Sequence, residues 1–218
     1  MAKLIWNQAG ERLYETGVKQ GVLYPQVNGA YPKGVAWSGL SAVSESPSGA
    51  EATPIYADDI KYLNLISVEE FGASIEAYMY PPEFDACLGN EELAPGVTIG
   101  QQAHQAFGMC YKTTIGNDTQ GNAFGYKLHL IYGANAAPSE RAYQTINDSP
   151  EPMTMSFELT TTPVNVTGKQ PTASLCFDST KTDAKVMKAI EDVLFGTDSE
   201  EAYLPLPDEI MEIIASAK

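Results

Sequence analysis

Arginine, histidine and cysteine are scarce in this chain, and its basic residues as a whole are outnumbered. The 218 residues include 13 Lys and Arg against 28 Asp and Glu, a net charge of −15, and the only arginines are Arg12 and Arg141. Nucleic-acid-binding proteins gain affinity by clustering Lys and Arg over the phosphate backbone, and anionic membranes attract basic segments in the same way. The composition therefore excludes a protein that holds DNA tightly, and it disfavours binding to an anionic membrane.

Long apolar runs are also missing. No uninterrupted stretch approaches the roughly 20 apolar residues that span a bilayer, and residues 1–8 show neither the apolar segment nor the cleavage site of a secretory signal. We therefore expect the protein to fold in a cytoplasm. The cysteines, Cys87, Cys110 and Cys176, are odd in number and far apart, which favours reduced, mostly buried thiols over a disulfide framework or a metal site.

No catalytic set is recognisable in the sequence. The two histidines, His104 and His129, are not flanked by a nucleophile motif such as Gly-x-Ser-x-Gly, and the spacing of His129 in its β-rich run is that of an ordinary polar residue on a sheet face. Adjacent carboxylates at Asp58–Asp59 and Glu69–Glu70 would point to opposite faces of a strand and would not converge. We predict that the protein is not an enzyme and has no catalytic residues.

Metal and nucleotide sites are only weakly indicated. Segment 117–122 matches the sequence pattern of a calcium-binding loop only weakly. Gly96 and Gly100 match neither type of phosphate-binding loop in their spacing, and no Lys-Ser/Thr pair follows them. We predict no metal-binding and no cofactor-binding residues.

Most of the chain consists of short alternating or β-rich runs between clusters of Gly, Pro, Asn and Asp, a pattern typical of antiparallel strands. The runs are numerous enough for one mainly β domain over residues 1–218, an antiparallel sandwich or barrel. Segment 116–122 predicts an exposed hairpin tip. The clear runs are Val35–Val43, Ile60–Ser67, Phe71–Tyr80, Phe107–Thr114, Tyr126–Tyr132, Thr154–Thr162 and Ala173–Phe177, and the weaker ones are Arg12–Val18 and Arg141–Ile146.

Helix is expected mainly near the C-terminus. Apolar residues at helical spacing, with Thr182 as a cap and Gly196 as a left-handed stop, predict one flanking helix over 183–195. Residues 197–218 are interpreted as a linker and a C-terminal arm, too short to be stable alone, which docks on its own domain or on a neighbour. A further helical turn is predicted at Pro82–Leu88.

A long connection over 44–54 separates two strand runs with turn formers and small residues. Connections of this length are usually functional or mobile. This one contains no His, Cys, Lys or Arg, so it offers little chemistry and is interpreted as a contact loop. Its predicted contact residues are Glu45, Ser46, Pro47, Ser48, Gly49 and Glu51.

Acidic residues are concentrated in one part of the chain. Between Lys33 and Lys112 the only basic residue is Lys61, against eleven Asp and Glu. Two interpretations remain open, namely a solvated acidic face that aids solubility and an assembled surface that repels a polyanion.

The runs Phe71–Tyr80 and Thr154–Thr162 share one pattern. The alternation places Phe71, Ala73, Ile75, Ala77 and Met79 on a core face of the first run, and Met155, Phe157 and Leu159 on that of the second. Each opposite, polar face carries a single central glutamate, Glu76 or Glu158. That polar face either is solvated, as in any antiparallel sandwich, or lines an enclosed space.

Several stretches, taken in order, resemble the major tail protein, or tail tube protein, of long-tailed non-contractile bacteriophages. Each stretch alone is weak, but their order and joint presence, from about Gly17 to Pro207, are fairly specific. They lie at Glu45–Glu51, Ala57–Leu63, Glu76–Phe84, Pro95–Gln102, Tyr111–Asp118, Gly125–His129, Ala137–Glu140 and Asn147–Glu151.

This resemblance implies a β-sandwich with a flanking helix that forms hexameric rings, stacked into a hollow tube through which the genome passes. It implies a virion protein assembled in the host cytoplasm, with no enzymatic activity. Its partners would be its own copies, a tape measure protein, and the tail terminator and distal tail proteins, while DNA slides past without specific binding. The loop 44–54 would contact an adjacent ring. From the polar faces we infer that Glu76, Glu158, Ser74 and Ser156 line the lumen.

Two other classes of function remain open. The 12 tyrosines, with Trp6 and Trp37, are compatible with a carbohydrate-binding or adhesin-like sandwich. An enzyme whose nucleophile lies outside the recognised motifs is a third possibility. Loss of saccharide binding on Trp37→Ala would favour the former, and turnover that survives loss of both histidines would favour the latter.

Overall fold

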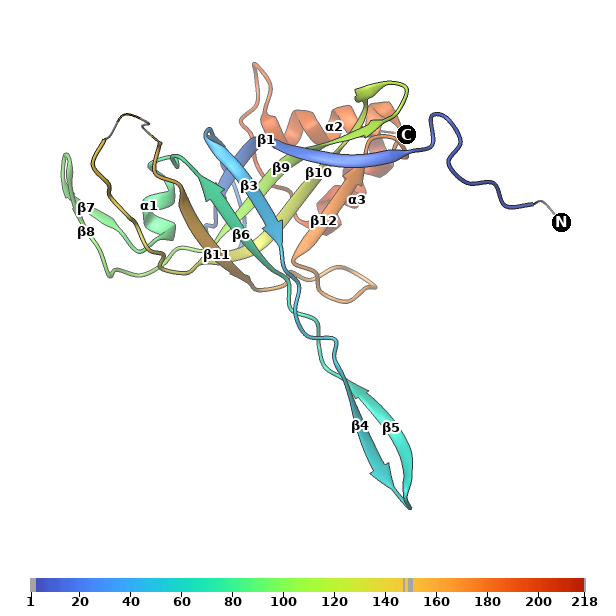
Figure 1. Cartoon of the computed structure of the whole chain (residues 1–218). Coiled ribbons are helices and arrows are strands. Elements are labelled where there is room, and N and C mark those ends of the chain that lie inside the picture. Colours follow the sequence, from blue (N-terminus) through green and yellow to red (C-terminus); the bar gives the residue numbers. More distant parts are fainter. Residues whose placement is uncertain (1–2, 147, 149–150, 218) are drawn as a thin grey trace.

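The computed structural model describes residues 3–146, 148 and 151–217 and shows a mainly β protein in which two helices near the C-terminus lie together on one side and a short helix lies apart from them (Figure 1). Asn147, Ser149 and Pro150, which belong to one of the matching stretches, and Lys218 of the C-terminal segment lie outside the described residues. The elements are β1 (Leu13–Pro25), β2 (Val35–Trp37), β3 (Leu40–Glu45), β4 (Ala52–Ala57), β5 (Ile60–Ile66), β6 (Gly72–Ala77), α1 (Phe84–Cys87), β7 (Glu91–Ala94), β8 (Val97–Ile99), β9 (Phe107–Asn117), β10 (Gly121–Ala136), β11 (Met155–Thr161), β12 (Ser174–Asp178), α2 (Ala184–Phe195) and α3 (Pro207–Ser216).

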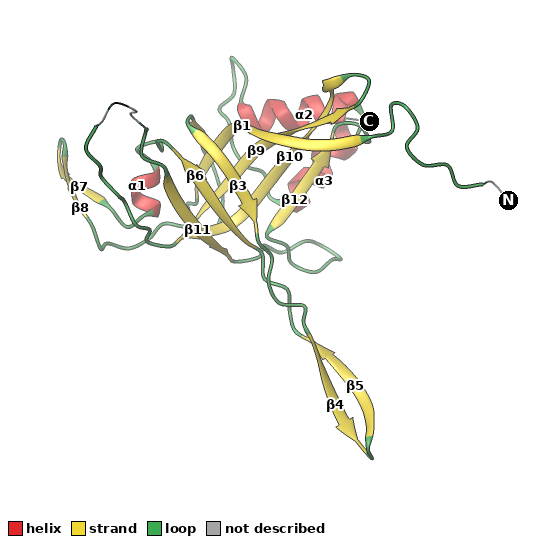
Figure 2. Cartoon of the chain, in the orientation of Figure 1, coloured by secondary structure: helices red, strands yellow, loops and turns green. Residues whose placement is uncertain are grey.

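The main sheet is antiparallel and curls on itself (Figure 2). Its strand order is β2-β1-β9-β10-β11-β6-β3, and β12 pairs with β10. The long strand β10 joins two layers, because residues 127–131 pair with β12 while residues 134–136 pair with β11. The switch occurs at Gly133, which has a φ of +57° and where a Cβ would lie 2.2 Å from the carbonyl oxygen of Thr162. Only glycine fits this bend without strain.

The two faces of β1, β9 and β10 each support a hydrophobic core. The first core lies inside the curled sheet and is covered by α1, where Phe84 packs edge-on against Phe107 and Phe157 at centroid distances of 5.3 Å and 5.2 Å. The second core lies between the opposite face and helices α2 and α3. Strand alternation divides the residues between the cores, so that Met109 faces the first and Cys110 the second. The predicted sandwich-like β class with a flanking helix is confirmed.

Helix α2 forms where the spacing predicted it, with a different cap. Asp183 accepts a hydrogen bond from the Lys185 backbone nitrogen at 2.8 Å, so the predicted cap Thr182 lies one residue too early. Gly196 ends the helix with a φ of +75°, as expected. The apolar stripe of α2 is buried on the sheet, and Glu191 on its flank pairs with Lys112 of β9 at 2.7 Å.

The C-terminal segment is not an extended arm but contains a second flanking helix, α3. Its proline at the first turn suits a helix start, and its acidic first turn favours the helix dipole. Ile210 is buried in the second core, and Leu204 pairs with Tyr31 through a β-bridge. Because a short amphipathic helix needs tertiary packing to be stable, this segment docks on its own chain.

Some strand boundaries differ from the predictions. The run Val35–Val43 is broken at Gly39, whose φ is +90°, and its halves pair with different strands, β1 and β6. The weak run Arg141–Ile146 is not a strand, and the hairpin β7–β8 was not predicted. Of the predicted hairpin tip 116–122, residues 118–120 are exposed as expected, whereas Gly116 and Asn117 are buried in β9. The helical turn α1 is confirmed. No helix of the described residues is both long and apolar enough to cross a membrane.

Candidate assembly site

A long two-stranded arm projects from the body of the protein (Figure 1). It begins where β3 and β6 leave the sheet and continues their ladder, since Ser46 N–H donates to the Gly72 carbonyl at 2.8 Å and Ser48 and Glu70 exchange both backbone bonds at 2.8 Å. It ends as the hairpin β4–β5. At 3.3 Å per residue, the twelve steps from Ser46 to the tip span about 40 Å. We call residues 46–71 the arm.

The tip of the arm is a two-residue turn. Asp58 and Asp59 have φ values of 52° and 60°, which is the left-handed conformation of the favoured hairpin turn, and aspartate tolerates it better than most residues. The sequence interpretation that placed this pair on a strand, facing opposite ways, is therefore wrong. The two carboxylates stand together at the far end of the arm.

Both faces of the β4–β5 hairpin expose apolar side chains. Cross-strand pairing and alternation place Ile55, Leu63 and Leu65 on one face and Tyr56, Tyr62 and Ile66 on the other. Their exposure reaches 71% for Ile66 and 68% for Tyr56. An isolated two-stranded hairpin is marginally stable in water, and an exposed apolar surface of this kind marks an interaction site. The arm therefore has the properties of a surface that contacts another protein chain.

The predicted contact loop 44–54 is corrected by this geometry. Its first residues end β3, its middle forms the paired base of the arm, and its last residues begin β4. Gly49 is required at the base, since its φ is +85° and a Cβ there would lie 2.2 Å from the Val68 carbonyl oxygen. The sequence missed β4 because Pro54 and the Ser-Gly-rich stretch before it indicate a loop. Proline is nevertheless tolerated on an edge strand.

Glu45, predicted as a free contact residue, is instead tied to the body. Its carboxylate accepts a hydrogen bond from the Tyr111 hydroxyl and lies 3.1 Å from His129 Nδ1. The hydrogen bond with His129 outweighs the opposing effect of burial and, with the Tyr111 hydroxyl, holds the pKa of Glu45 below its ordinary value. Burial and the Glu45 carboxylate both raise the pKa of Tyr111. Side-chain contacts thus hold Glu45, the last residue before the arm, against β9 and β10.

The same group of side chains extends to β1. The rings of His129 and Tyr111 stack at 4.7 Å, and His129 Nε2 lies 3.0 Å from Thr113 Oγ1. Glu15 pairs with Lys127 and accepts from Thr113. Burial opposes its ionisation, yet these bonds prevail and lower its pKa. We call Glu15, Glu45, Tyr111, Thr113, Lys127 and His129 the anchor cluster; it joins four strands at the base of the arm.

The four residues inferred to line a lumen share one face of the sheet, on which Glu76, Ser156 and Glu158 are exposed and Ser74 is half-buried. Ser156 lies opposite Glu76 and Glu158 lies opposite Ser74 on the neighbouring strands β6 and β11. Their strand neighbours, such as Ile75 and Phe157, are fully buried in the first core. The predicted alternation fails only beyond Ala77, where β6 ends: Met79 is 65% exposed, while Tyr80 packs against the core.

The other singled-out residues serve the fold. His104 Nδ1 contacts the Cys87 carbonyl at 3.1 Å beside α1. Trp37 is 3% exposed and donates its indole N–H to the Met79 carbonyl at 2.9 Å, so it is not available to a saccharide. Cys87 and Cys110 are buried thiols and Cys176 is an exposed one. Within residues 3–146, 148 and 151–217, no three His, Cys, Asp or Glu side chains form a group that could hold a metal ion.

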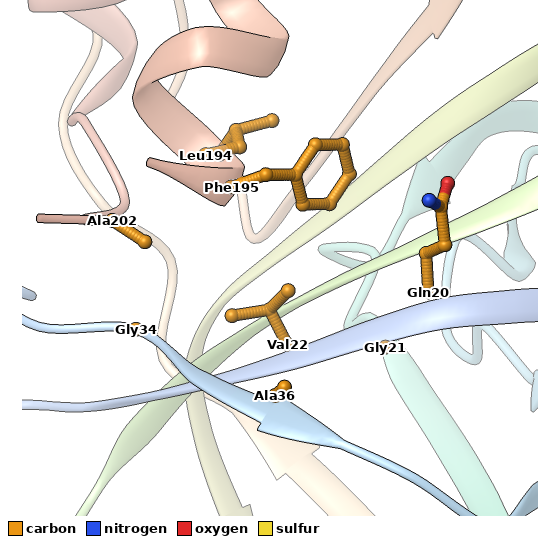
Figure 3. A pocket seen from close by; sticks show the side chains of 8 residues that line it. All are labelled: Gln20, Gly21, Val22, Gly34, Ala36, Leu194, Phe195 and Ala202. Carbon is orange, nitrogen blue, oxygen red and sulfur yellow. The ribbon is translucent and has the colours of Figure 1, made fainter. Parts of the chain in front are cut away.

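A groove between β1 and the end of α2 was not foreseen from the sequence. It has a volume of about 390 Å³, which lies in the range of protein binding pockets. Phe195 and Leu194 face Val22 and Ala36 across it (Figure 3). Its lining residues are mostly small or apolar, namely Gln20, Gly21, Val22, Gly34, Ala36, Leu194, Phe195 and Ala202. We call it the β1–α2 groove.

Comparison with known proteins adds a distant structural similarity. No protein-family model and no curated protein matches the chain. Among solved structures, it is similar to a chain in the cryo-EM structure of the anti-feeding prophage (AFP) baseplate, 6-fold symmetrised, with 11% identity and a TM-score of 0.40. The alignment covers 80% of this chain and 97% of that one. A similarity of this size does not define a function, which has to be inferred from the residues and surfaces of this chain.

Proposed function

We propose that this protein is a structural subunit of a bacteriophage tail tube, which polymerises as stacked hexameric rings into the conduit for genome delivery. The observation that carries the proposal is the arm, a hairpin of about 40 Å whose two faces expose large apolar side chains away from both cores. Such a surface is costly in a solitary protein and becomes useful when another subunit covers it.

The sequence resemblance gives this assembly its particular form. In the proposed tube the partners are other copies of the chain, a tape measure protein, and the terminator and distal tail proteins at its ends. The protein acts in the virion tail after assembly in the host cytoplasm, without a cofactor and without catalysis. Closing the sheets of neighbouring subunits into a ring would also protect the edge strands that a single copy leaves open.

Negative charge suits a wall past which DNA must slide. Cations on the wall would exchange with the counterions of the DNA phosphates and hold the strand, whereas carboxylates repel it over roughly 8–10 Å at physiological salt. The exposed patch with Glu76 and Glu158 offers two carboxylates per subunit on a sheet face whose other side is core. We propose this face as the lumen.

The proposed function is tested by electron microscopy of the concentrated, purified protein. Rings or tubes with sixfold symmetry are the expected result. Strictly monomeric behaviour in sedimentation at all concentrations, also when tail-initiation components are added, would overturn the proposal.

Charge inversion at Glu76 and Glu158 tests the lumenal position separately. Glu76→Lys combined with Glu158→Lys should leave folding and tube formation intact, because both side chains point away from the core. It should slow DNA ejection, since phosphates would now bind the wall. Glu91→Lys combined with Glu140→Lys, which changes two exposed acids elsewhere, is the matched control. Ejection at the wild-type rate in the Glu76/Glu158 variant would place this patch outside the lumen.

A further inference from the structure

The charge of the chain is polarised between its N-terminal part and the following segment, residues 34–111, which contains the arm. Residues 3–33 carry four basic residues, Lys3, Arg12, Lys19 and Lys33, against two acids, whereas residues 34–111 carry eleven acids against one base. One end of the sequence is thus locally positive in a protein of net charge −15. Opposite local charges of this kind steer two surfaces toward each other.

The positive part borders the β1–α2 groove. Lys19 and Lys33 are exposed and directly precede the lining residues Gln20 and Gly34. Lys19 is the cross-strand partner of Lys112, whose side chain reaches α2. Lys19 therefore lies on the face of β1 that carries the groove. Neither Lys19 nor Lys33 takes part in an ion pair within the described part of the chain.

The arm tip has the complementary chemistry. Asp58 and Asp59 supply two adjacent carboxylates, and the residues beside them, Tyr56 and Ile60, are large, apolar and more than 60% exposed, at 68% and 63%. The groove is lined by the apolar side chains of Val22, Ala36 and Phe195, and the exposed Lys19 and Lys33 flank its lining residues in the sequence. One apolar side chain of the tip can fill the groove while its aspartates lie between the two lysines, which flank opposite ends of the groove.

The arm of a chain cannot reach its own groove. The tip lies at one end of the molecule, and α2, which forms one wall of the groove, lies on the far side of the body (Figure 1). We propose that the arm tip of one copy docks in the β1–α2 groove of a second copy. The two surfaces differ, so the contact is head-to-tail and propagates from copy to copy. This inference rests on the proposed function and names the surface that receives the arm.

The acidic linker beside Ala202 sets the direction of docking. Glu200 and Glu201 precede Ala202, whose carbonyl accepts a hydrogen bond from Gly34 N–H at 2.7 Å, so they border the groove at its Lys33 end and would repel the aspartates of an incoming tip. The aspartates are thereby directed toward Lys19. Neutralising the pair with Glu200→Gln and Glu201→Gln should consequently strengthen assembly rather than weaken it.

A charge-swap experiment tests the contact. Lys19→Glu with Lys33→Glu, and separately Asp58→Lys with Asp59→Lys, should each raise the concentration needed for assembly by about tenfold or more, because like charges then face each other. Mixing the two variants should restore assembly, since each Lys tip meets a Glu-rimmed groove and each Asp tip a Lys-rimmed one. Asp58→Asn with Asp59→Asn removes the charge while keeping a residue that tolerates the turn, and circular dichroism checks that every variant is folded.

The outcomes separate the two proposals. A wild-type protein that never assembles overturns the proposed function. If the wild-type protein assembles and the Lys19→Glu, Lys33→Glu variant assembles by itself at the same concentration, docking of the tip in this groove is overturned, while the proposed function stands. Failure of the mixed variants to assemble, although each is folded, also overturns it.

Discussion

Replacing the β4–β5 hairpin of the arm with a two-residue turn is expected to abolish ring and tube formation and to leave the body of the protein folded. Glu51 and Ser67 face each other across the ladder, and Ser67 N–H donates to the Glu51 carbonyl at 3.2 Å. An Asn-Gly turn in place of residues 52–66 therefore closes the hairpin with suitable geometry. Because neither hydrophobic core contains a residue of this segment, the melting temperature should change by only a few degrees.

The expected loss is large because the assembly would bury several large apolar side chains of the arm. Burying a large side chain stabilises a contact by roughly 1.5–3 kcal/mol, and the hairpin presents several such side chains on its two faces. Losing them should raise the assembly concentration by more than about 100-fold, which corresponds to about 2.8 kcal/mol. Sedimentation across a concentration series measures this shift.

A matched control removes the other exposed hairpin. Glu91 and Ile99 are cross-strand partners, so an Asn-Gly turn in place of residues 92–98 shortens β7–β8 in the same way. It removes exposed Leu93 and Val97 but leaves the arm intact, and assembly should persist. An armless protein that forms tubes at the wild-type concentration would contradict the role given to the arm.

The local patterns of the sequence predict the parts of this fold that depend on short-range periodicity. Alternation in β6 and β11 correctly places Ile75 and Phe157 in the core and Glu76 and Glu158 on the surface. Helical spacing correctly gives α2. These features follow from the side-chain periodicities of 2 residues in a strand and 3.6 residues in a helix, which a single sequence displays directly.

The parts that sequence reasoning missed depend on contacts between distant residues. Nothing local in Ser46–Glu51 indicates that it pairs with a segment some twenty residues later. The two-residue turn Asp58–Asp59 between β-rich runs is the one signal that indicates a hairpin. The anchor cluster joins Glu45 to His129 across 84 positions and Glu15 to Lys127 across 112, and only the folded sheet order makes these residues neighbours.

The second large expected effect is a loss of folding stability when the anchor cluster is changed. Glu45→Ala leaves the buried Tyr111 hydroxyl and one nitrogen of His129 without their acceptor. An unsatisfied buried polar group costs about 1–3 kcal/mol, so we expect a loss of about 2 kcal/mol. In a chain of this size that lowers the melting temperature by about 4–8 °C. Glu51→Ala is the matched control, because Glu51 lies on the exposed arm and outside the cluster, and its melting temperature should stay within about 1 °C of the wild type.

The effect of Glu45→Ala should depend on pH in one direction. The pKa of Glu45 is lowered in the folded state, so its charged form is favoured by folding. The resulting stability is fully present above the unfolded pKa of about 4.5 and is lost as the pH falls through the lower, folded value. The difference in melting temperature between wild type and Glu45→Ala should therefore shrink below about pH 4.5. A difference that stays constant into acid would show that the Glu45 carboxylate does not stabilise the base of the arm through its charge.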